Sequence, residues 1–327
     1  MFLNDRMKPK ELIFLETLSR RCELTSLEAR KLSILKKGYE GEQEYDRIFE
    51  EAGHDNLLIY RDLWLKIEGS TLQIDSLIIA GNKLIVNEIK NYSGLYSYKD
   101  SGWFINGTQI SEEPLAQAAR TGNKLLKLRA LLQLNFEREY KVVFVNPNFN
   151  LNIAPEDEKN IVQRSMLRHY MKELNKILID ARARGISLKL KDYFIDDPMP
   201  LPEVDAARVK GGSYCSRCGS FGIVLERYHA TCINCNNKET TEKMIVRSII
   251  DFNVLFHNRP MTKESVRQFV GLSKNERSFR RILNKYGEKT GAGRSTAYTL
   301  ETLDMAKLLK IKNYRSRYDK DDKLVND

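Results

Sequence analysis

The chain has 327 residues, of which 54 are Lys or Arg and 44 are Asp or Glu, so its formal net charge is +10. This composition is typical of a soluble chain of roughly two or three domains, and no apolar run approaches the ~18 residues that a membrane-spanning helix needs. Charged residues interrupt the first 15 positions, which excludes the apolar centre of a secretory signal, so we expect a cytoplasmic protein with no membrane partner. The basic surplus suggests a polyanionic partner, although charge alone does not separate nucleic acid from a merely soluble surface.

The N-terminal part of the chain is predicted to be helical. Residues 1–37 mix apolar and charged side chains without strand alternation, which predicts an N-terminal helical arm. A second helical stretch, over 39–52, carries an apolar stripe at positions i, i+3, i+4 and i+7, namely Tyr45, Ile48, Phe49 and Ala52. Glu42 lies on this stripe, and a carboxylate on the core-facing side needs a partner because burying it alone is costly.

The next segments change to a strand-like pattern. Strands are predicted at 57–65, 73–79, 83–90, 94–99 and 102–105, with a short piece after Asn106-Gly107. Both Gly81-Asn82 and Asn106-Gly107 are typical of tight hairpin turns. A helix is then predicted over 113–134, a strand over 140–145 and a long helix over 156–184. This order of helix, strands, helix, strand and helix predicts a mixed α/β core.

The most informative segment is the predicted hairpin over residues 73–90. If Gly81-Asn82 is a two-residue turn, Ala80 faces Lys83 and the numbers of paired residues sum to 163, which places Asp75 opposite Glu88. Directly paired Cβ atoms are about 4.5–5.5 Å apart. Lys90 follows Glu88 by two positions, so it points to the same face as both carboxylates.

This pattern of two acids and a lysine predicts a cation site. Two carboxylates at that separation repel each other unless one is protonated or a cation lies between them, and a hard cation such as Mg²⁺ is the natural occupant. Lys90 can then orient a water molecule or stabilise charge on a phosphate. The alternative is a half-exposed hairpin whose charges are solvated. Glu42 favours the metal site, because it offers a third carboxylate from a neighbouring helix.

Four short motifs keep the order and spacing of a known family over residues 35–135. They are Gly38-Tyr-Glu-Gly41-Glu42, Gln73-Ile74-Asp75, Glu88-Ile-Lys90-Asn91-Tyr92-Ser93-Gly94 and Pro114-Leu-Ala-Gln117. Asp75 with Glu88 and Lys90 resembles the PD-(D/E)XK nuclease core, and the four motifs together resemble the nuclease-related domain called NERD. One departure is Thr121, at a position where related nucleases often carry Tyr.

The resemblance implies a restriction-endonuclease-like fold and metal-dependent hydrolysis of phosphodiester bonds. By position, it implies that Asp75 and Glu88 bind Mg²⁺ or Mn²⁺ and that Lys90 is catalytic. It further implies that Glu42 is the helix carboxylate of the site and that Gln117 is an auxiliary site residue. These five residues are the catalytic candidates.

A second candidate metal site contains four of the five cysteines. Cys215 and Cys218 form one CxxC pair, and Cys232 and Cys235 form another after 13 intervening residues. This spacing is typical of a four-thiolate Zn²⁺ site, which is closed and therefore structural, and residues 223–225 are predicted to form a short strand between the pairs. The module resembles a zinc ribbon, and a dithiol redox pair is the alternative.

The last part of the chain is basic and helical. Helices are predicted over 244–256, from the N-cap Thr262 to Val270, and after a capping box of Ser273 with Glu276. The last of these helices has a predicted buried stripe of Phe279, Ile282, Leu283 and Tyr286. With the hairpin tip at 291–294 and the strand at 295–300, this order resembles a winged helix-turn-helix.

Most of the excess charge lies in this C-terminal segment. Residues 261–315 contain 13 Lys and Arg against 5 Asp and Glu, which is the expected footprint for nucleic-acid contacts. The nucleic-acid-binding candidates are Lys274, Arg277, Arg281, Asn284 and Arg294. The alternative is a helical protein-interaction domain with a solvated face.

The sequence thus predicts an α/β restriction-endonuclease-like core followed by a zinc ribbon and a winged-helix domain. The expected parts are a helical arm (1–37), a NERD nuclease-like domain (38–197), a linker (198–212), the ribbon (213–238), the winged helix-turn-helix (239–315) and a polar tail (316–327). The predicted function is a metal-dependent nuclease that acts on DNA rather than RNA and that can form a homo-oligomer. The alternative is a non-catalytic DNA-binding regulator or a scaffold that uses a nuclease-like fold.

Overall fold

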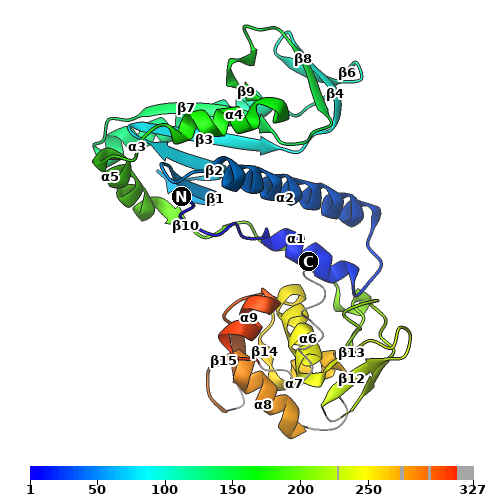
Figure 1. Ribbon diagram of the computed structural model, residues 1–327. Coiled ribbons are helices and arrows are strands. Elements are labelled where there is room, and N and C mark those ends of the chain that lie inside the picture. The colour runs from blue at the N-terminus through cyan, green and yellow to red at the C-terminus, as the bar shows by residue number, and fades with distance from the viewer. Residues whose placement is uncertain (227, 273–275, 294–295, 315–327) are drawn as a thin grey trace. The chain divides into compact units, whose positions relative to one another are not determined.

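The computed structural model describes residues 1–226, 228–272, 276–293 and 296–314. The chain forms two compact units (Figure 1). Unit 1 contains Met1–Pro9 and Ser33–Met199, and unit 2 contains Lys10–Leu32 and Pro200–Asp327. Helix α2 (Ser26–Ala52) contributes residues to both units. Over the described ranges, each helix is too short or too polar to cross a membrane.

Unit 1 is built on a six-stranded mixed sheet. In spatial order the strands are β10 (Phe194–Ile195), β1 (Leu58–Ile67), β2 (Ser70–Ala80), β3 (Lys83–Lys90), β7 (Glu137–Phe144) and β9 (Ile161–Val162). Short turns join β1, β2 and β3, so these neighbours are antiparallel. β7 runs parallel to β3, as a long crossover connection allows, and helix α3 (Pro114–Leu132) lies within that connection.

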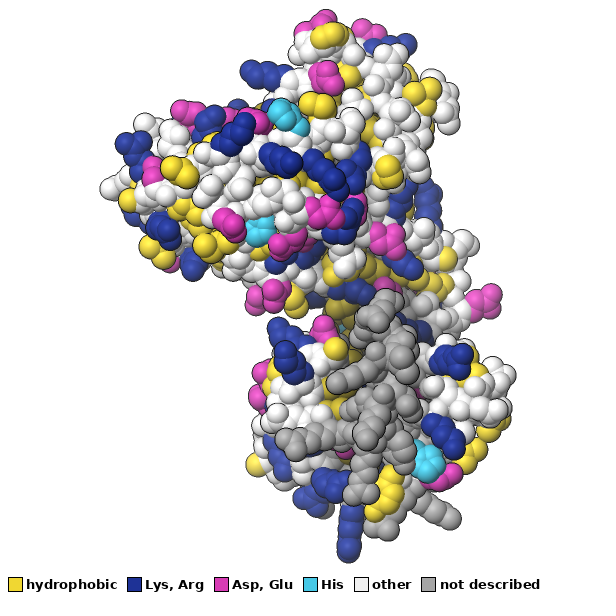
Figure 2. Space-filling model, in the orientation of Figure 1, with side chains coloured by type: hydrophobic (Ala, Val, Ile, Leu, Met, Phe, Trp, Pro, Cys, Tyr) yellow, Lys and Arg dark blue, Asp and Glu magenta, His cyan; other side chains and the backbone are white. Residues whose placement is uncertain are grey.

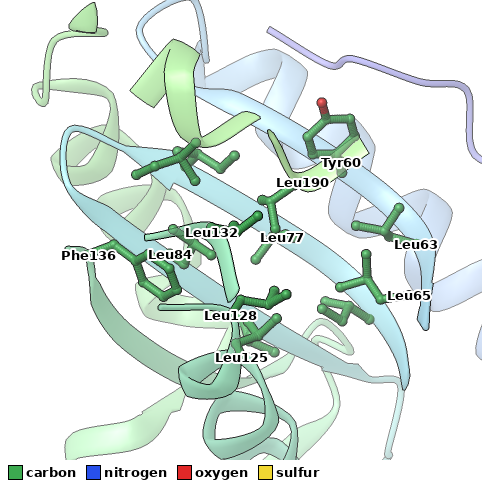
Figure 3. Close-up of a cluster of buried hydrophobic side chains, with 14 of the residues drawn as sticks. Tyr60, Leu63, Leu65, Leu77, Leu84, Leu125, Leu128, Leu132, Phe136 and Leu190 are labelled. Carbon is green, nitrogen blue, oxygen red and sulfur yellow. The ribbon is translucent and has the colours of Figure 1, made fainter. Parts of the chain in front are cut away.

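Helices cover both faces of this sheet, which makes unit 1 a three-layer α/β structure. α3 and α5 (Ala181–Leu190) bury one side against one face, as Figure 3 shows for Leu125, Leu128, Leu132 and Leu190. α2 and α4 (Arg164–Asn175) cover the opposite face through Tyr45, Ile48, Phe49, Leu167, Met171 and Leu174. On the face of unit 1 in Figure 2, basic and acidic side chains are interspersed.

A second sheet of unit 1 lies beyond the C-terminal end of β3. Its strands, in spatial order, are β6 (Thr108–Gln109), β5 (Gly102–Ile105), β4 (Gly94–Lys99) and β8 (Phe149–Ile153). Aromatic side chains form its core, with Trp103 fully buried and the rings of Phe144 and Phe149 stacked at 3.9 Å. The turn between β5 and β6 is the predicted Asn106-Gly107 pair, and both residues have the positive φ that this turn requires.

The central strands β1 and β2 change the face toward which their apolar side chains point. On each strand two residues three positions apart lie in the cluster facing α3 and α5, namely Ile74 with Leu77 and Tyr60 with Leu63. Residues three apart in a regular strand point to opposite faces. The register between the two strands is nevertheless unchanged, and Asp62 adopts the left-handed φ of 46°. The reversal therefore centres on Asp62 and on the part of β2 that contains Asp75.

The predicted helical arm over 1–37 is wrong for its first nine residues. α1 (Lys10–Ser19) and the start of α2 are helical, but residues 1–9 are extended. Phe2 forms a parallel bridge with Ile59, and the N–H of Leu3 donates to the Ile59 carbonyl at 2.8 Å. The physical reason is that the backbone N–H and C=O groups of Ile59 form hydrogen bonds with Met1 and Leu3, which an N-terminal helix could not provide.

The long helix predicted over 156–184 is also wrong. The segment forms β9, then α4, a turn and α5. Asp180 ends any continuous helix, because its extended backbone and its carboxylate, which accepts from the Ala183 N–H at 2.8 Å, make it the N-cap of α5.

Unit 2 combines a small cysteine-containing sheet with a helical part. The small sheet has the order β11 (Ile223–Leu225), β12 (His229–Cys232) and β13 (Lys238–Thr240), and β11 matches the predicted strand. The helical part contains α6 (Thr241–Leu255), α7 (Lys263–Val270), α8 (Glu276–Tyr286) and α9 (Met305–Ile311) with β14 (Met261–Thr262), β15 (Gly287–Thr290) and β16 (Ala297–Leu300). α1 packs against α6, and Arg21 forms a fully buried ion pair with Asp251 at 2.7 Å.

Candidate functional site

The predicted hairpin register is confirmed by the pairing of β2 with β3. Ala80 faces Lys83 and Ser76 faces Asn87, so the numbers of the paired residues sum to 163. Gly81 supplies the positive φ that the two-residue turn requires. This turn fixes the positions of Asp75 and Glu88 relative to each other.

Asp75 lies where the regular pairing of β2 with β3 ends. Its Oδ2 accepts a hydrogen bond from the Ile89 N–H at 2.8 Å, so its side chain reaches toward the backbone of β3. Gln73, two residues before Asp75, faces Trp64 on β1, and its side-chain amide donates to Asp62 at 3.0 Å. The backbone pairing of β2 with β3 therefore ends at Asp75, where the two strands diverge.

Glu88, Lys90 and Gln117 form one polar chain between β3 and α3. Glu88 is only 4% exposed, and its Oε1 accepts from the Lys90 ammonium at 2.8 Å. The same ammonium donates to Oε1 of Gln117 at 3.2 Å. Pro114 in the first turn of α3 begins the helix at the point that brings Gln117 to Lys90. The structure thus brings these three predicted site residues together.

Glu42 is held by Arg6 of the N-terminal segment. The Arg6 guanidinium donates to Glu42 Oε2 at 2.8 Å and to both oxygens of Asp46, at 2.7 and 3.0 Å. It also donates to the backbone carbonyl of Asp75 at 3.3 Å. The Asp46 carboxylate accepts in addition from Arg61 at 3.3 Å. The helix carboxylate is therefore linked to the Asp75 strand through an arginine.

The electrostatics of the site favour a bound cation. Burial, and then the neighbouring Glu88 and Glu42 carboxylates, raise the pKa of Asp75 well above its usual value. Burial also raises the pKa of Glu42, although Arg6 opposes this. Burial acts to lower the pKa of Lys90, but its pairing with Glu88 outweighs this and the net pKa is raised, so Lys90 stays charged. A cation beside Asp75 and Glu88 relieves the repulsion that these shifts reflect.

A close approach of α2 to the residue after Lys90 explains one motif glycine. A Cβ at Gly41 would lie 2.5 Å from Cβ of Asn91, whereas a Cβ at Gly38, one turn earlier, would meet nothing within 4 Å. The Asn91 amide donates to the backbone carbonyl of Lys37 at 2.7 Å, which fixes α2 against this strand end. Gly41 therefore sets the distance between the Glu42 helix and the Lys90 strand.

Gly41→Ala is expected to destabilise unit 1 by about 1–3 kcal/mol, because the added methyl group must displace Asn91. The matched control is Gly38→Ala, which has open space and is expected to raise stability by about 0.5–1 kcal/mol through helix propensity. Urea unfolding monitored by tryptophan fluorescence measures both, since Trp64 and Trp103 lie in unit 1. Equal effects of the two changes would contradict the close approach.

The carboxylates of Asp75 and Glu88 are the kind of oxygen ligand that a hard cation such as Mg²⁺ prefers. Among the described residues, however, the set of three or more possible metal ligands whose ligand atoms lie within 4.8 Å of one another is the four cysteines. Glu42, Asp75 and Glu88 do not form such a set. The predicted third carboxylate is near the site and paired with Arg6.

The four cysteines form a site that can hold a metal ion such as Zn²⁺. The Sγ atoms of Cys215 and Cys235 are 3.6 Å apart, as are those of Cys218 and Cys232. The Asn234 and Asn237 amides approach Sγ of Cys218 and Cys215 at 3.7 Å, and such donors favour thiolates. The four sulfur atoms fit the tetrahedral thiolate set that zinc prefers. Cys22 lies outside this set.

The predicted nucleic-acid contacts are only partly described. Arg277, Arg281 and Asn284 are exposed on α8, opposite the predicted stripe, whose four residues are at most 5% exposed. Asn284 also accepts a hydrogen bond from the Tyr298 hydroxyl of β16 at 3.0 Å. Lys274 and Arg294 lie outside the described residues, as does Ser273 of the expected capping box.

The motifs and the β2–β3 hairpin lie in a segment that matches a known protein family. Residues 37–146 match the nuclease-related domain, NERD. This NERD segment contains all five catalytic candidates and excludes Arg6, α4 and α5. No curated protein and no solved structure matched the chain.

Sequence reasoning missed the residues that surround Glu42. Arg6, Asp46 and Arg61 form a buried or half-buried network with it, in which the Arg6 side chain is 4% exposed. One available signal was the spacing of Glu42 and Asp46, because two acids at i and i+4 share a helix face and need a common cation. Arg6, the partner of these two acids, was missed because residues 1–9 were expected to be helical.

Proposed function

We propose that the chain is a divalent-metal-dependent nuclease with its active site in the NERD segment. The observation that carries this proposal is the cluster of Asp75, Glu88 and Lys90 at the divergence of β2 and β3, with Lys90 bonded to both Glu88 and Gln117. The helix, sheet and helix layers around it support a restriction-endonuclease-like core of the PD-(D/E)XK type.

Each site residue has a distinct role in this proposal. Asp75 and Glu88 hold Mg²⁺ or Mn²⁺, which when bound polarises the phosphate and lowers the pKa of a water. Lys90 presents a positive charge that stabilises the negative charge growing on the phosphate. Gln117 and Glu88 fix the direction of the Lys90 ammonium. Glu42 supports the site from α2 through its ion pair with Arg6.

Unit 2 is proposed to bind the nucleic acid. The order α6, β14, α7, α8, β15 and β16, with a sheet in the order β14-β16-β15, supports a winged-helix arrangement. α8 would then be the helix that enters a groove of DNA, with Arg277 and Arg281 exposed upon it. The cysteine module is proposed to be a zinc ribbon that supports this domain.

A cleavage assay tests the proposed nuclease. We expect the zinc-loaded full chain to cut DNA in the presence of Mg²⁺ or Mn²⁺ and not with EDTA, and Asp75→Asn to lower the rate by more than about a hundredfold, since a catalytic metal supplies several kcal/mol. Single-stranded DNA, double-stranded DNA and RNA are compared. The control is Asp157→Asn, which removes an exposed aspartate of a unit 1 loop and is expected to leave the rate unchanged.

The assay also separates the second candidate function. A non-catalytic DNA-binding regulator would bind DNA in a salt-dependent manner without metal-dependent cleavage, and the exposed arginines of α8 would account for that binding. Cleavage that survives Asp75→Asn at the wild-type rate would contradict the proposed site.

A further inference from the structure

The Arg6 guanidinium is a buried cation inside the proposed catalytic site. Its side chain is 4% exposed, and its hydrogen bonds reach Glu42, Asp46 and the backbone carbonyl of Asp75. The Asp46 interaction is bidentate, which fixes the plane of the guanidinium. The backbone of Met1 and Leu3 bonds Ile59 of β1, and the Asn4 side chain bonds the backbone of Arg61, so these contacts deliver Arg6 to this position.

The charges on the two sides of Asp75 differ. On the α2 side, the carboxylates of Glu42 and Asp46 form ion pairs with the guanidinium groups of Arg6 and Arg61, and Asp62 adds a negative charge that acts on Glu42. On the β3 side, the carboxylates of Asp75 and Glu88 face the single ammonium of Lys90. Glu42 therefore has an ion-pair partner in Arg6, whereas the Asp75 carboxylate accepts from the Ile89 N–H and has no ion pair among the described contacts, so a divalent cation is attracted to Asp75 and Glu88.

A second divalent ion that used Glu42 as a ligand would lie between Glu42 and Asp75. Arg6 already bonds Glu42 Oε2 and the Asp75 carbonyl, so its positive charge lies on that side of Asp75. A guanidinium remains charged at every pH at which a protein is folded, and its charge repels a divalent ion at close range. The Glu42 carboxylate therefore has a cationic partner without a metal ion.

We propose that Arg6 is a positioning residue that takes the place of a second cation beside Glu42, so that the site binds one divalent ion through Asp75 and Glu88. This inference rests on the proposed function, whose metal site it refines. Glu42 then acts through Arg6, and the N-terminal segment becomes part of the catalytic unit although it lies outside the NERD segment.

Calorimetric titration of Mn²⁺ into the zinc-loaded full chain tests the ion count. We expect one Mn²⁺ per wild-type chain, loss of that binding in Asp75→Asn, and a dissociation constant within about threefold of wild type in Glu42→Gln. Loss of binding in Glu42→Gln, or two ions per wild-type chain that both disappear in Asp75→Asn, would overturn the inference. Neither of these variants removes Arg6, so both tests stand if the Arg6 variant does not fold.

Arg6→Met adds a direct test with a matched control. We expect a second, weaker Mn²⁺-binding event, because Glu42 loses its cation. Arg47→Met removes an arginine of α2 that pairs with Glu44 and Glu51 on the surface, and it is expected to keep one event. A folded Arg6→Met chain that binds one Mn²⁺ with wild-type affinity would overturn the inference. The cleavage assay distinguishes the two proposals, since a chain that binds one ion through Asp75 but cuts nothing retains this inference and refutes the nuclease.

Discussion

Replacing Lys90 with Met is expected to lower the cleavage rate constant by about 10²–10³-fold, the range typical for loss of one group that stabilises transition-state charge. Mn²⁺ should bind at least as tightly as in the wild type, because Glu88 loses the ammonium that it pairs with at 2.8 Å. Metal binding and catalysis would thus change in opposite directions. A general loss of structure would weaken both.

The same strand offers a control for Lys90. Lys83 lies at the other end of β3, more exposed, and its ammonium pairs with Glu139 at 2.5 Å on the surface. Lys83→Met is expected to leave the cleavage rate and the Mn²⁺ affinity within experimental error of wild type. A Lys90→Met chain with the wild-type rate constant would show that the phosphate is stabilised by another group.

Removal of zinc from the four-cysteine site is expected to unfold the β11–β13 sheet and to destabilise the helices of unit 2. A structural zinc site of this kind contributes roughly 10–16 kcal/mol of binding free energy to folding. The sheet continues into α6 without a linker, because Thr240 is both the last residue of β13 and the N-cap of α6. Loss of the sheet therefore removes the start of the central helix.

Cys232→Ser tests this coupling without a chelator. We expect less than one zinc per chain, and faster amide hydrogen exchange in α6 as well as in β12, while exchange in β2 and β3 of unit 1 stays at the wild-type rate. Cys22→Ser is the matched control, since Cys22 lies outside the cluster and should leave the zinc content unchanged. Full zinc content with wild-type exchange in Cys232→Ser would contradict the four-thiolate site.

The parts of the structure that were predicted correctly depend on short-range rules. The β2–β3 register follows from a two-residue turn that Gly81 permits, and the buried stripe of α8 follows from the helical period. The same holds for the N-cap Thr262, whose side chain accepts from the Ser265 N–H. In each case the deciding contacts lie within a few residues.

The parts that were missed depend on contacts distant in sequence. The extended form of residues 1–9 is decided by β1, since Asn4 bonds the backbone of Arg61 across 57 positions. The position of Glu42 is decided by Arg6 in the same way. The face reversal of β1 and β2 has no local signal either, because Asp62 takes a left-handed φ that its sequence context does not require.

The candidate site was accordingly predicted in its composition more completely than in its arrangement. The structure places Glu88, Lys90 and Gln117 in one hydrogen-bonded chain and Asp75 beside it. Glu42 needed a structure, because its partner comes from a segment that helical propensity assigns to another element. The roles of these residues stay predictions until cleavage and metal binding are measured.

The buried pair of Arg21 with Asp251 has a consequence for the order in which the chain folds during synthesis. The partners are 230 residues apart, so at about 5–20 residues per second α1 is made on the order of 10–50 s before Asp251. Unit 1 has all of its strands once β10 has been made, whereas Leu12, Phe14, Leu15 and Leu18 of α1 still lack α6, against which α1 packs. The nascent chain therefore carries an apolar helix face that stays unburied until α6 has been made.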